Sequence, residues 1–325
     1  MNRVITIIHT TKKTLMRTKI QILMLGFAVA LASCSNNDVL QSENNDGLVP
    51  VSITASLPEG GMTSRANAQG DEEVTRCLVQ IIDQTGSYNE TMTMTGSETA
   101  GFNTTVYLNP EREYKFLFWA DRGESHYTVD TSAGNALSNV RLADDDADIA
   151  YFGETSGTWS STGIHCDLTH AVAKITLNTT GMLTTSSQYT VTVTLPENST
   201  GTVFDVDAGS VTGSLQGAYT YTFNTDATYS GTTGSPAEIG FFYALVKSGD
   251  TNQLSLQYNG LKQNPAEPIP NVPLQPNYHI TLQGDVANAG LIEGNITATI
   301  IPGWDQEGST TVEFPKQDTG STTTE

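Results

Sequence analysis

Short segments in which apolar and polar residues alternate recur along most of the chain. In the first of them Val51, Ile53, Ala55 and Leu57 alternate with Ser and Thr, and Pro58 ends the pattern. A period of two with polar, often β-branched residues at alternate positions is typical of antiparallel strands with one face in water. Further strands are predicted at 78–82 (a continuous apolar run), 114–118, 171–177, 189–195, 219–223, 254–258, 278–282 and 296–300.

Many short strands separated by Gly, Asn, Asp and Pro predict an all-β protein built as a sandwich or barrel. A polar stretch from Thr155 to Gly163 is the predicted boundary between two β-domains of similar size, at 48–158 and 164–315. Residues 316–325 are too polar to pack and are expected to form a loose tail.

The only sustained helical pattern lies near the N-terminus and resembles an export signal. Arg17 and Lys19 precede an apolar run, which ends in Leu-Ala-Ser before Cys34. This order predicts a signal peptide over residues 1–33, with Met16 as an alternative start, and a lipid attached to Cys34 of an exported bacterial lipoprotein. The alternative is an ordinary signal peptide followed by a chance Cys, whereas the run is too short for a membrane span. Residues 34–47 are polar and predict a flexible tether.

Charge narrows the possible partners. The mature chain, residues 34–325, has 10 basic and 35 acidic residues, a net charge of −25. Such a balance argues against nucleic acid and against charge-driven binding to anionic lipid, both of which need a basic face. An acidic surface instead keeps a secreted protein soluble.

The sequence gives only weak evidence for a metal site or for a disulfide. Cys77 and Cys166 predict either one disulfide bridge or two buried thiols. The run Asp144–Asp148 has consecutive acids without the Gly of a calcium loop, which favours a solvated loop. His165, Cys166 and His170 lack a second ligand pair for zinc. No metal or other cofactor is predicted.

Catalytic motifs do not emerge from the sequence. The chain has no Gly-x-Ser-x-Gly elbow, no Cys in a protease-like context and no phosphate-binding Gly loop between a strand and a helix. Paired carboxylates for glycoside hydrolysis are neither indicated nor refuted by so acidic a sequence. We therefore predict that the protein is not an enzyme.

A different kind of site follows the first predicted strand. Residues 58–71 include a Gly pair and Arg65 in polar surroundings, and accessible loops of this kind are cut by proteases. Cleavage at Arg65 would free the strand from Val51 to Leu57, and another chain's strand would fill the vacated groove by β-addition. The alternative is an ordinary surface arginine.

Several segments together resemble the fimbrillin family of lipoprotein pilins from Gram-negative gut and oral anaerobes. They are the Leu-Ala-Ser-Cys lipobox, Ser64–Ala66, Glu113–Asp121, Asp148–Gly153, His170–Ile175, Pro276–Gly284 and Pro302–Trp304, spread over nearly the whole mature chain.

The resemblance implies two transthyretin-like β-sandwich domains and delivery to the outer membrane and cell surface through Cys34. It implies cleavage at Arg65 by an Arg-specific protease and pilus assembly with neighbouring subunits by donor-strand exchange. The displaced strand would carry Val51, Ile53, Ala55 and Leu57. The candidate donor, Thr310–Phe314, has only Val312 and Phe314 as apolar anchors.

These observations leave three functions open. A fimbrial subunit or fimbrillin-like adhesin leads. An outer-membrane lipoprotein that binds surface glycans is the alternative, and it would need an exposed aromatic platform such as Trp159. An enzyme on a β-sandwich scaffold is the third.

Overall fold

Strands make up nearly all of the regular structure, which confirms the all-β prediction. The structure is a computed structural model and describes residues 47–58, 73–158, 163–183, 189–215, 217–224, 228–260, 263–291, 296–304 and 310–312. Within these ranges no helix is both long and apolar enough to cross a membrane.

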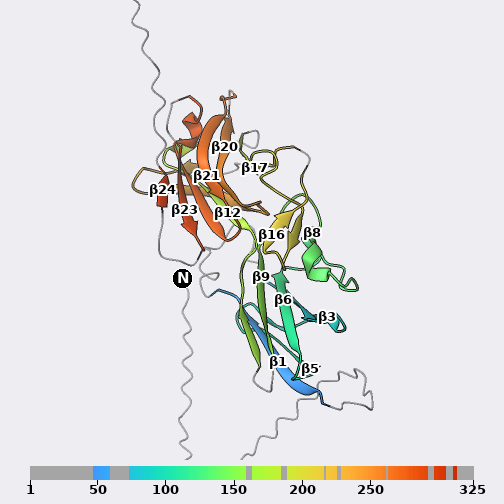
Figure 1. The fold of residues 1–325 in the computed structure, drawn as a ribbon. Coiled ribbons are helices and arrows are strands. Elements are labelled where there is room, and N and C mark those ends of the chain that lie inside the picture. The colour runs from blue at the N-terminus through green and yellow to red at the C-terminus, as the bar shows by residue number, and fades with distance from the viewer. Residues whose placement is uncertain are drawn as a thin grey trace, which may run out of the picture. The chain divides into compact units, whose positions relative to one another are not determined.

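Two sheets form the first sandwich (Figure 1). Their inner side chains share one hydrophobic core. The first sheet has the order β10-β1-β5-β4 and the second the order β11-β9-β6-β2-β3. The strands of the first sheet are β1 (Val49–Ser56), β4 (Thr95–Ser97), β5 (Gly101–Leu108) and β10 (Ile164–Asp167). Those of the second are β2 (Arg76–Asp83), β3 (Asn89–Thr93), β6 (Glu113–Asp121), β9 (Ala150–Thr158) and β11 (Thr169–His170).

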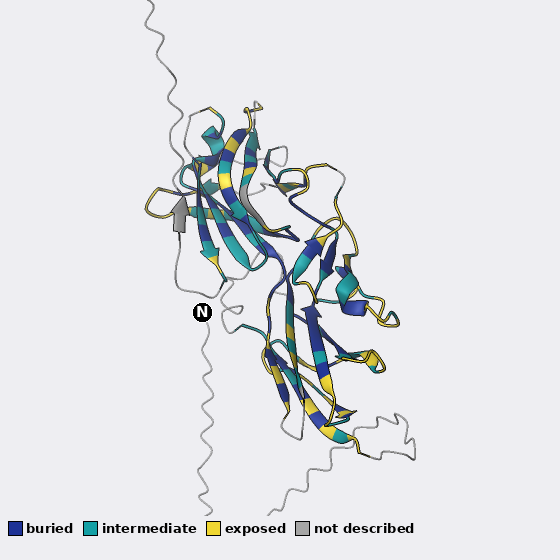
Figure 2. Cartoon of the chain, in the orientation of Figure 1, coloured by how far each residue is buried: buried dark blue, intermediate teal, exposed yellow. Residues whose placement is uncertain are grey.

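The apolar run of β6 is continuous because both of its faces are covered. Residues Phe116 to Ala120 are all buried, so successive side chains on opposite faces of the strand avoid water. On one face the Trp119 ring lies 5.4 Å from that of Phe204, between ring centroids. Figure 2 shows this continuous burial along β6, in contrast to the alternation along β1.

Phe204 belongs to a small additional sheet with the order β16-β15-β8-β7. It joins residues near 127–142 to residues near 203–212, which are distant in sequence, and its buried side chains belong to the first core. Its elements are β7 (Tyr127–Thr128), η2 (Ala136–Asn139), β8 (Val140–Leu142), β15 (Val203–Asp205) and β16 (Ser210–Thr212).

The second sandwich has its own core and is built from two larger sheets and a two-stranded one. The orders are β19-β12-β22-β23-β24, β17-β14-β20-β21 and β13-β18. The strands of the first of these are β12 (Ala173–Thr179), β19 (Ala237–Ala244), β22 (Tyr278–Gly284), β23 (Ile296–Pro302) and β24 (Thr310–Val312). The rest are β13 (Met182–Leu183), β14 (Thr190–Thr194), β17 (Thr220–Asn224), β18 (Tyr229–Ser230), β20 (Gly249–Asn259) and β21 (Glu267–Leu274), with η3 (Val286–Asn288).

The stretch expected to link two domains differs from the prediction. Residues 155–158 are strand, paired with β6 from Glu113 to Phe116, and β10 pairs with β1 in the first sandwich. The first core continues to Val172, and the second core begins at Ala173. Residues 155–158 are polar and yet form a strand, because a strand with one face in water needs apolar residues on only its other face.

Both sandwiches also contain a parallel pair, so neither is purely antiparallel. β1 runs parallel to β10, and β12 runs parallel to β22. In each case the first strand of a sandwich lies between a late parallel strand and an antiparallel one. This shared topology places β1 in the interior of its sheet.

Candidate functional site

The site predicted around β1 is an interior position in the first sheet. β1 pairs with β5 antiparallel from Val49 to Ala55 and with β10 parallel from Ile53 to Ser56. We call the space between β5 and β10 that β1 occupies the β1 slot. Removing β1 would leave unpaired backbone groups along both walls of this slot.

The side chains predicted to anchor β1 point into the first core. Val51 and Ile53 are fully buried and Ala55 is 2% exposed. Leu57, just beyond the strand, is partly buried and packs against the same core. The intervening Ser52 is exposed, as the period-two pattern predicted.

On the outer face, polar side chains tie β1 to β10. The Thr54 hydroxyl donates to the carbonyl of Ile164 at 3.0 Å, and Thr54 Oγ1 lies 2.9 Å from His165 Nδ1. The Ser56 hydroxyl donates to Asp167, whose Oδ1 lies 3.0 Å from His165 Nε2. The Ser56 hydroxyl and then the His165 imidazole lower the pKa of Asp167.

Two glycines let the walls approach β1 closely. Gly101 of β5 has φ +74°, and a Cβ there would lie 3.1 Å from the carbonyl oxygen of Ala55. At Gly163, just before β10, a Cβ would lie 3.0 Å from the carbonyl oxygen of Ser52. Larger residues at either position would press on the backbone of β1.

The predicted donor strand lies at the edge of a sheet in the second sandwich. Among the residues that the structure describes, β24 pairs with β23 alone, from Ile300 opposite Thr310 to Ala298 opposite Val312. The described residues do not include Cys34, Arg65, Trp159 or Phe314. The roles predicted for these four residues therefore stay predictions.

The two remaining cysteines are free thiols, and both are buried. Cys77 lies on β2 with its sulfur 3.6 Å from that of Met94. Burial raises the pKa of Cys166 to about 11 and raises that of Cys77 further. Of the two predicted states, the structure therefore has buried thiols that are poor nucleophiles at neutral pH.

The three residues considered for zinc are not brought together. His165 is on the outer face of β10, Cys166 points to the core, and His170 stacks on the Trp304 ring at 3.6 Å between centroids. Burial lowers the pKa of His170 to about 3, so it is neutral at physiological pH. No group of three or more potential metal ligands occurs among the residues described.

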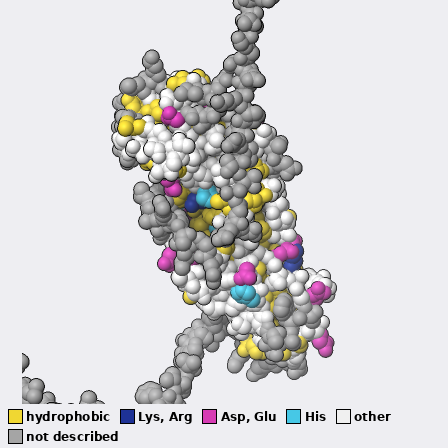
Figure 3. Space-filling view, turned by 90° about the vertical axis from the view of Figure 1, so that its left-hand side faces the viewer, with side chains coloured by type: hydrophobic (Ala, Val, Ile, Leu, Met, Phe, Trp, Pro, Cys, Tyr) yellow, Lys and Arg dark blue, Asp and Glu magenta, His cyan; other side chains and the backbone are white. Residues whose placement is uncertain are grey.

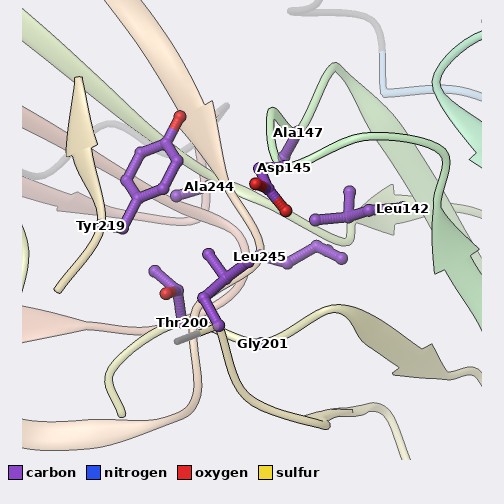
Figure 4. A pocket seen from close by; sticks show the side chains of 9 residues that line it. Leu142, Asp145, Ala147, Thr200, Gly201, Tyr219, Ala244 and Leu245 are labelled. Carbon is purple, nitrogen blue, oxygen red and sulfur yellow. The ribbon is translucent and has the colours of Figure 1, made fainter. Parts of the chain in front are cut away.

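The acidic run is partly a loop and partly buried. Asp144 to Asp146 are exposed, and the Tyr219 hydroxyl donates to Asp146 at 2.9 Å. Asp148 is buried and bonded by Arg122 at 3.1 Å. The hollow that Asp145 lines beside Tyr219 (Figure 4) has a volume of about 10 Å³, room for one water molecule and not for a substrate.

Two aromatic features were not predicted as sites. Tyr107 on β5 is 58% exposed, beside Pro50 of β1. Trp304 stacks on His170 and Tyr243, and the Lys174 ammonium lies 5.8 Å from its ring centre. Figure 3 shows a basic and a His side chain among hydrophobic side chains on one face. Period-two alternation in the sequence places Tyr107 on an outer face, whereas the Trp304 contacts join residues distant in sequence.

The family described as "Family of unknown function (DUF6562)" matches residues 43–322. No curated protein matches.

Among solved structures, a fimbrial assembly protein from Parabacteroides distasonis is similar, with 12% identity and a TM-score of 0.43 over 82% of this chain and 99% of that one. The fimbrial anchor protein Mfa2 from Porphyromonas gingivalis has 13% identity and a TM-score of 0.45 over 78% and 98%. A Bacteroides thetaiotaomicron protein, assigned provisionally to polysaccharide binding, has 12% identity and a TM-score of 0.46 over 82% and 100%.

Proposed function

We propose that this chain, which belongs to the family of unknown function DUF6562, is a fimbrial subunit or fimbrillin-like surface adhesin assembled by strand exchange. In this proposal Cys34 carries the lipid that holds the protein at the outer membrane. Cleavage after Arg65 then releases β1, and a neighbouring subunit supplies a strand to the β1 slot.

The observation that carries the proposal is the place of β1. It is the first strand of the fold, it has ladders on both sides, and its inward side chains reach the core. A replacement strand would restore both ladders and rebury the apolar walls at once.

The second sandwich offers an internal comparison. β12 has neighbours of the same kind, a parallel β22 and an antiparallel β19. However, β12 is connected to β11 through only two residues, Ala171 and Val172, both fully buried. β1 is instead followed by residues 58–72, which contain the Gly pair and Arg65. The exchangeable strand is therefore β1.

Limited proteolysis tests the proposal. The mature chain with Cys34→Ser, which prevents acylation, is treated with a low dose of trypsin. Gel electrophoresis follows the cut, and fluorescence anisotropy follows the uptake of a labelled peptide of residues 48–57. We expect an early cut after Arg65, after which the peptide replaces β1 in the slot. The Arg65→Ala variant is the control and should take up no peptide.

A protein that is cut after Arg65 but takes up no such peptide would contradict strand exchange. If that cut protein takes up no peptide and the uncut protein binds sugars on a glycan array, surface glycan binding is the better function. Tyr107 would then be the first residue to replace, because its ring is the exposed aromatic of the first sheet.

A further inference from the structure

A strand that replaces β1 must fill four inward positions of the slot. They now hold Val51, Ile53, Ala55 and Leu57, in that order. The first three side chains are at most 2% exposed, so each position has a definite size. The pattern along the strand is branched, branched, small, branched.

The side chains around the third inward position leave room only for a small residue. In the register of the sheet Ala55 lies between Phe102 of β5 and Cys166 of β10, and both of these side chains are buried. Side chains directly opposite on adjacent strands are in contact distance, so the Phe102 ring and the Cys166 thiol border the Ala55 methyl. A large side chain there would overpack a closely filled core.

We infer that the β1 slot takes its strand from a different protein, and that this strand runs parallel to β10 with a small residue at the third inward position. The inference rests on the proposed function and names the partner of the same site. It excludes the chain's own C-terminal strand as the occupant, so that this subunit would need a heterologous donor.

The C-terminal sequence Thr310-Thr-Val-Glu-Phe-Pro-Lys316 mismatches the slot in each of the three registers that keep the direction of β1 and turn both Val312 and Phe314 inward. With Val312 in place of Ile53, Phe314 falls at the small third position. With Val312 in place of Val51, Lys316 falls there, and a buried unpaired ammonium is strongly unfavourable.

The remaining register brings Phe314 to the position of Leu57 and puts the polar Thr310 at the fully buried position of Ile53. Pro315 is a further mismatch wherever its nitrogen points toward β5 or β10. A proline nitrogen carries no hydrogen, so it cannot donate a hydrogen bond to the neighbouring strand. A strand with Val or Ile at the first two inward positions and Ala, Gly or Ser at the third meets none of these obstacles.

Peptide exchange into the cut protein tests the inference. The Cys34→Ser mature chain is cut after Arg65, and fluorescent peptides compete for the slot, followed by fluorescence anisotropy. One peptide is residues 48–57; the others carry Ala55→Phe or Ser52→Phe, and a fourth is residues 309–317. Ser52 is exposed, so Ser52→Phe adds the same ring on the outer face and serves as the matched control.

We expect the 48–57 peptide and its Ser52→Phe form to bind alike. The Ala55→Phe peptide should bind at least about tenfold more weakly, as overpacking of a core position implies. The 309–317 peptide should be weaker still. Equal binding of the Ala55→Phe peptide or of the 309–317 peptide would overturn the inference and leave strand exchange intact. If even the 48–57 peptide does not bind, the proposed function itself fails.

Discussion

Ile53 and Ser52 are adjacent in β1 but lie in opposite environments. The Ile53 side chain is fully buried between Thr104 of β5 and Ile164 of β10, whereas Ser52 is exposed. Burial of a branched aliphatic side chain is a main source of folding free energy, and truncation leaves a cavity as well as losing burial. The contribution of β1 to the stability of the uncut protein therefore comes mainly from its inward side chains.

In the uncut chain, Ile53→Ala should lower the free energy of unfolding by about 2–5 kcal/mol, as for other buried Ile-to-Ala changes. Ser52→Ala, the matched control, should change it by less than about 0.5 kcal/mol. Urea unfolding followed by tryptophan fluorescence measures both. Equal effects of the two substitutions would mean that β1 does not pack against the core as described.

At the scale of elements, the sheet edges differ in how readily they accept another strand. β21, at the edge of its sheet, contains Pro268 and Pro270, two residues apart, so that both ring nitrogens face the same side. Proline donates no hydrogen bond, and such residues protect an edge from strand addition. In the proposed function, assembly would therefore use the β1 slot and not this edge.

The contact between β1 and β10 should respond to acid through Asp167. Because the folded state lowers the pKa of this carboxyl, its ionised form stabilises the contact above the ordinary aspartate value of 3.8. The stabilisation disappears as the pH falls through the lowered value. Release of β1 from the cut protein should therefore accelerate below about pH 4, as measured by exchange with a labelled 48–57 peptide.

The Asp167→Asn variant separates this carboxylate from the many others of the chain. Asn keeps the size of the side chain but does not ionise, so the acid acceleration should be smaller in the variant than in the parent protein. Identical acceleration in both would show that protonation of other groups controls release.

At the scale of the whole molecule, the net charge of −25 in the mature chain opposes association. Two acidic subunits repel each other at the distances at which an encounter forms, and dissolved salt screens this repulsion. The burial of β1 side chains at close range is much less sensitive to salt.

Assembly of the cut protein with a strand-donating partner of similar charge should therefore speed up between about 20 mM and about 300 mM salt. Light scattering over time measures the rate, and uncut protein at both concentrations provides the baseline. A rate that falls with salt would indicate that a basic partner, attracted by the acidic surface, supplies the strand.

The sequence by itself determined the local features of this protein. Period-two alternation at Val51, Ile53 and Ala55 correctly gave a strand with one buried face, because side-chain direction in a strand depends only on position along the chain. The same rule gave the β-rich fold class. Composition gave the acidic character, and the Leu-Ala-Ser-Cys order predicted the lipid site.

Only the tertiary structure decided which strands lie side by side. That β1 lies between β5 and β10, that Phe102 and Cys166 border Ala55, and that residues 203–212 pack on the first core all depend on contacts between distant segments. Alternation is the same whichever strand lies alongside, so it cannot specify a partner. For this reason the strand was predictable, whereas its slot, and the size of the residue the slot accepts, required the fold.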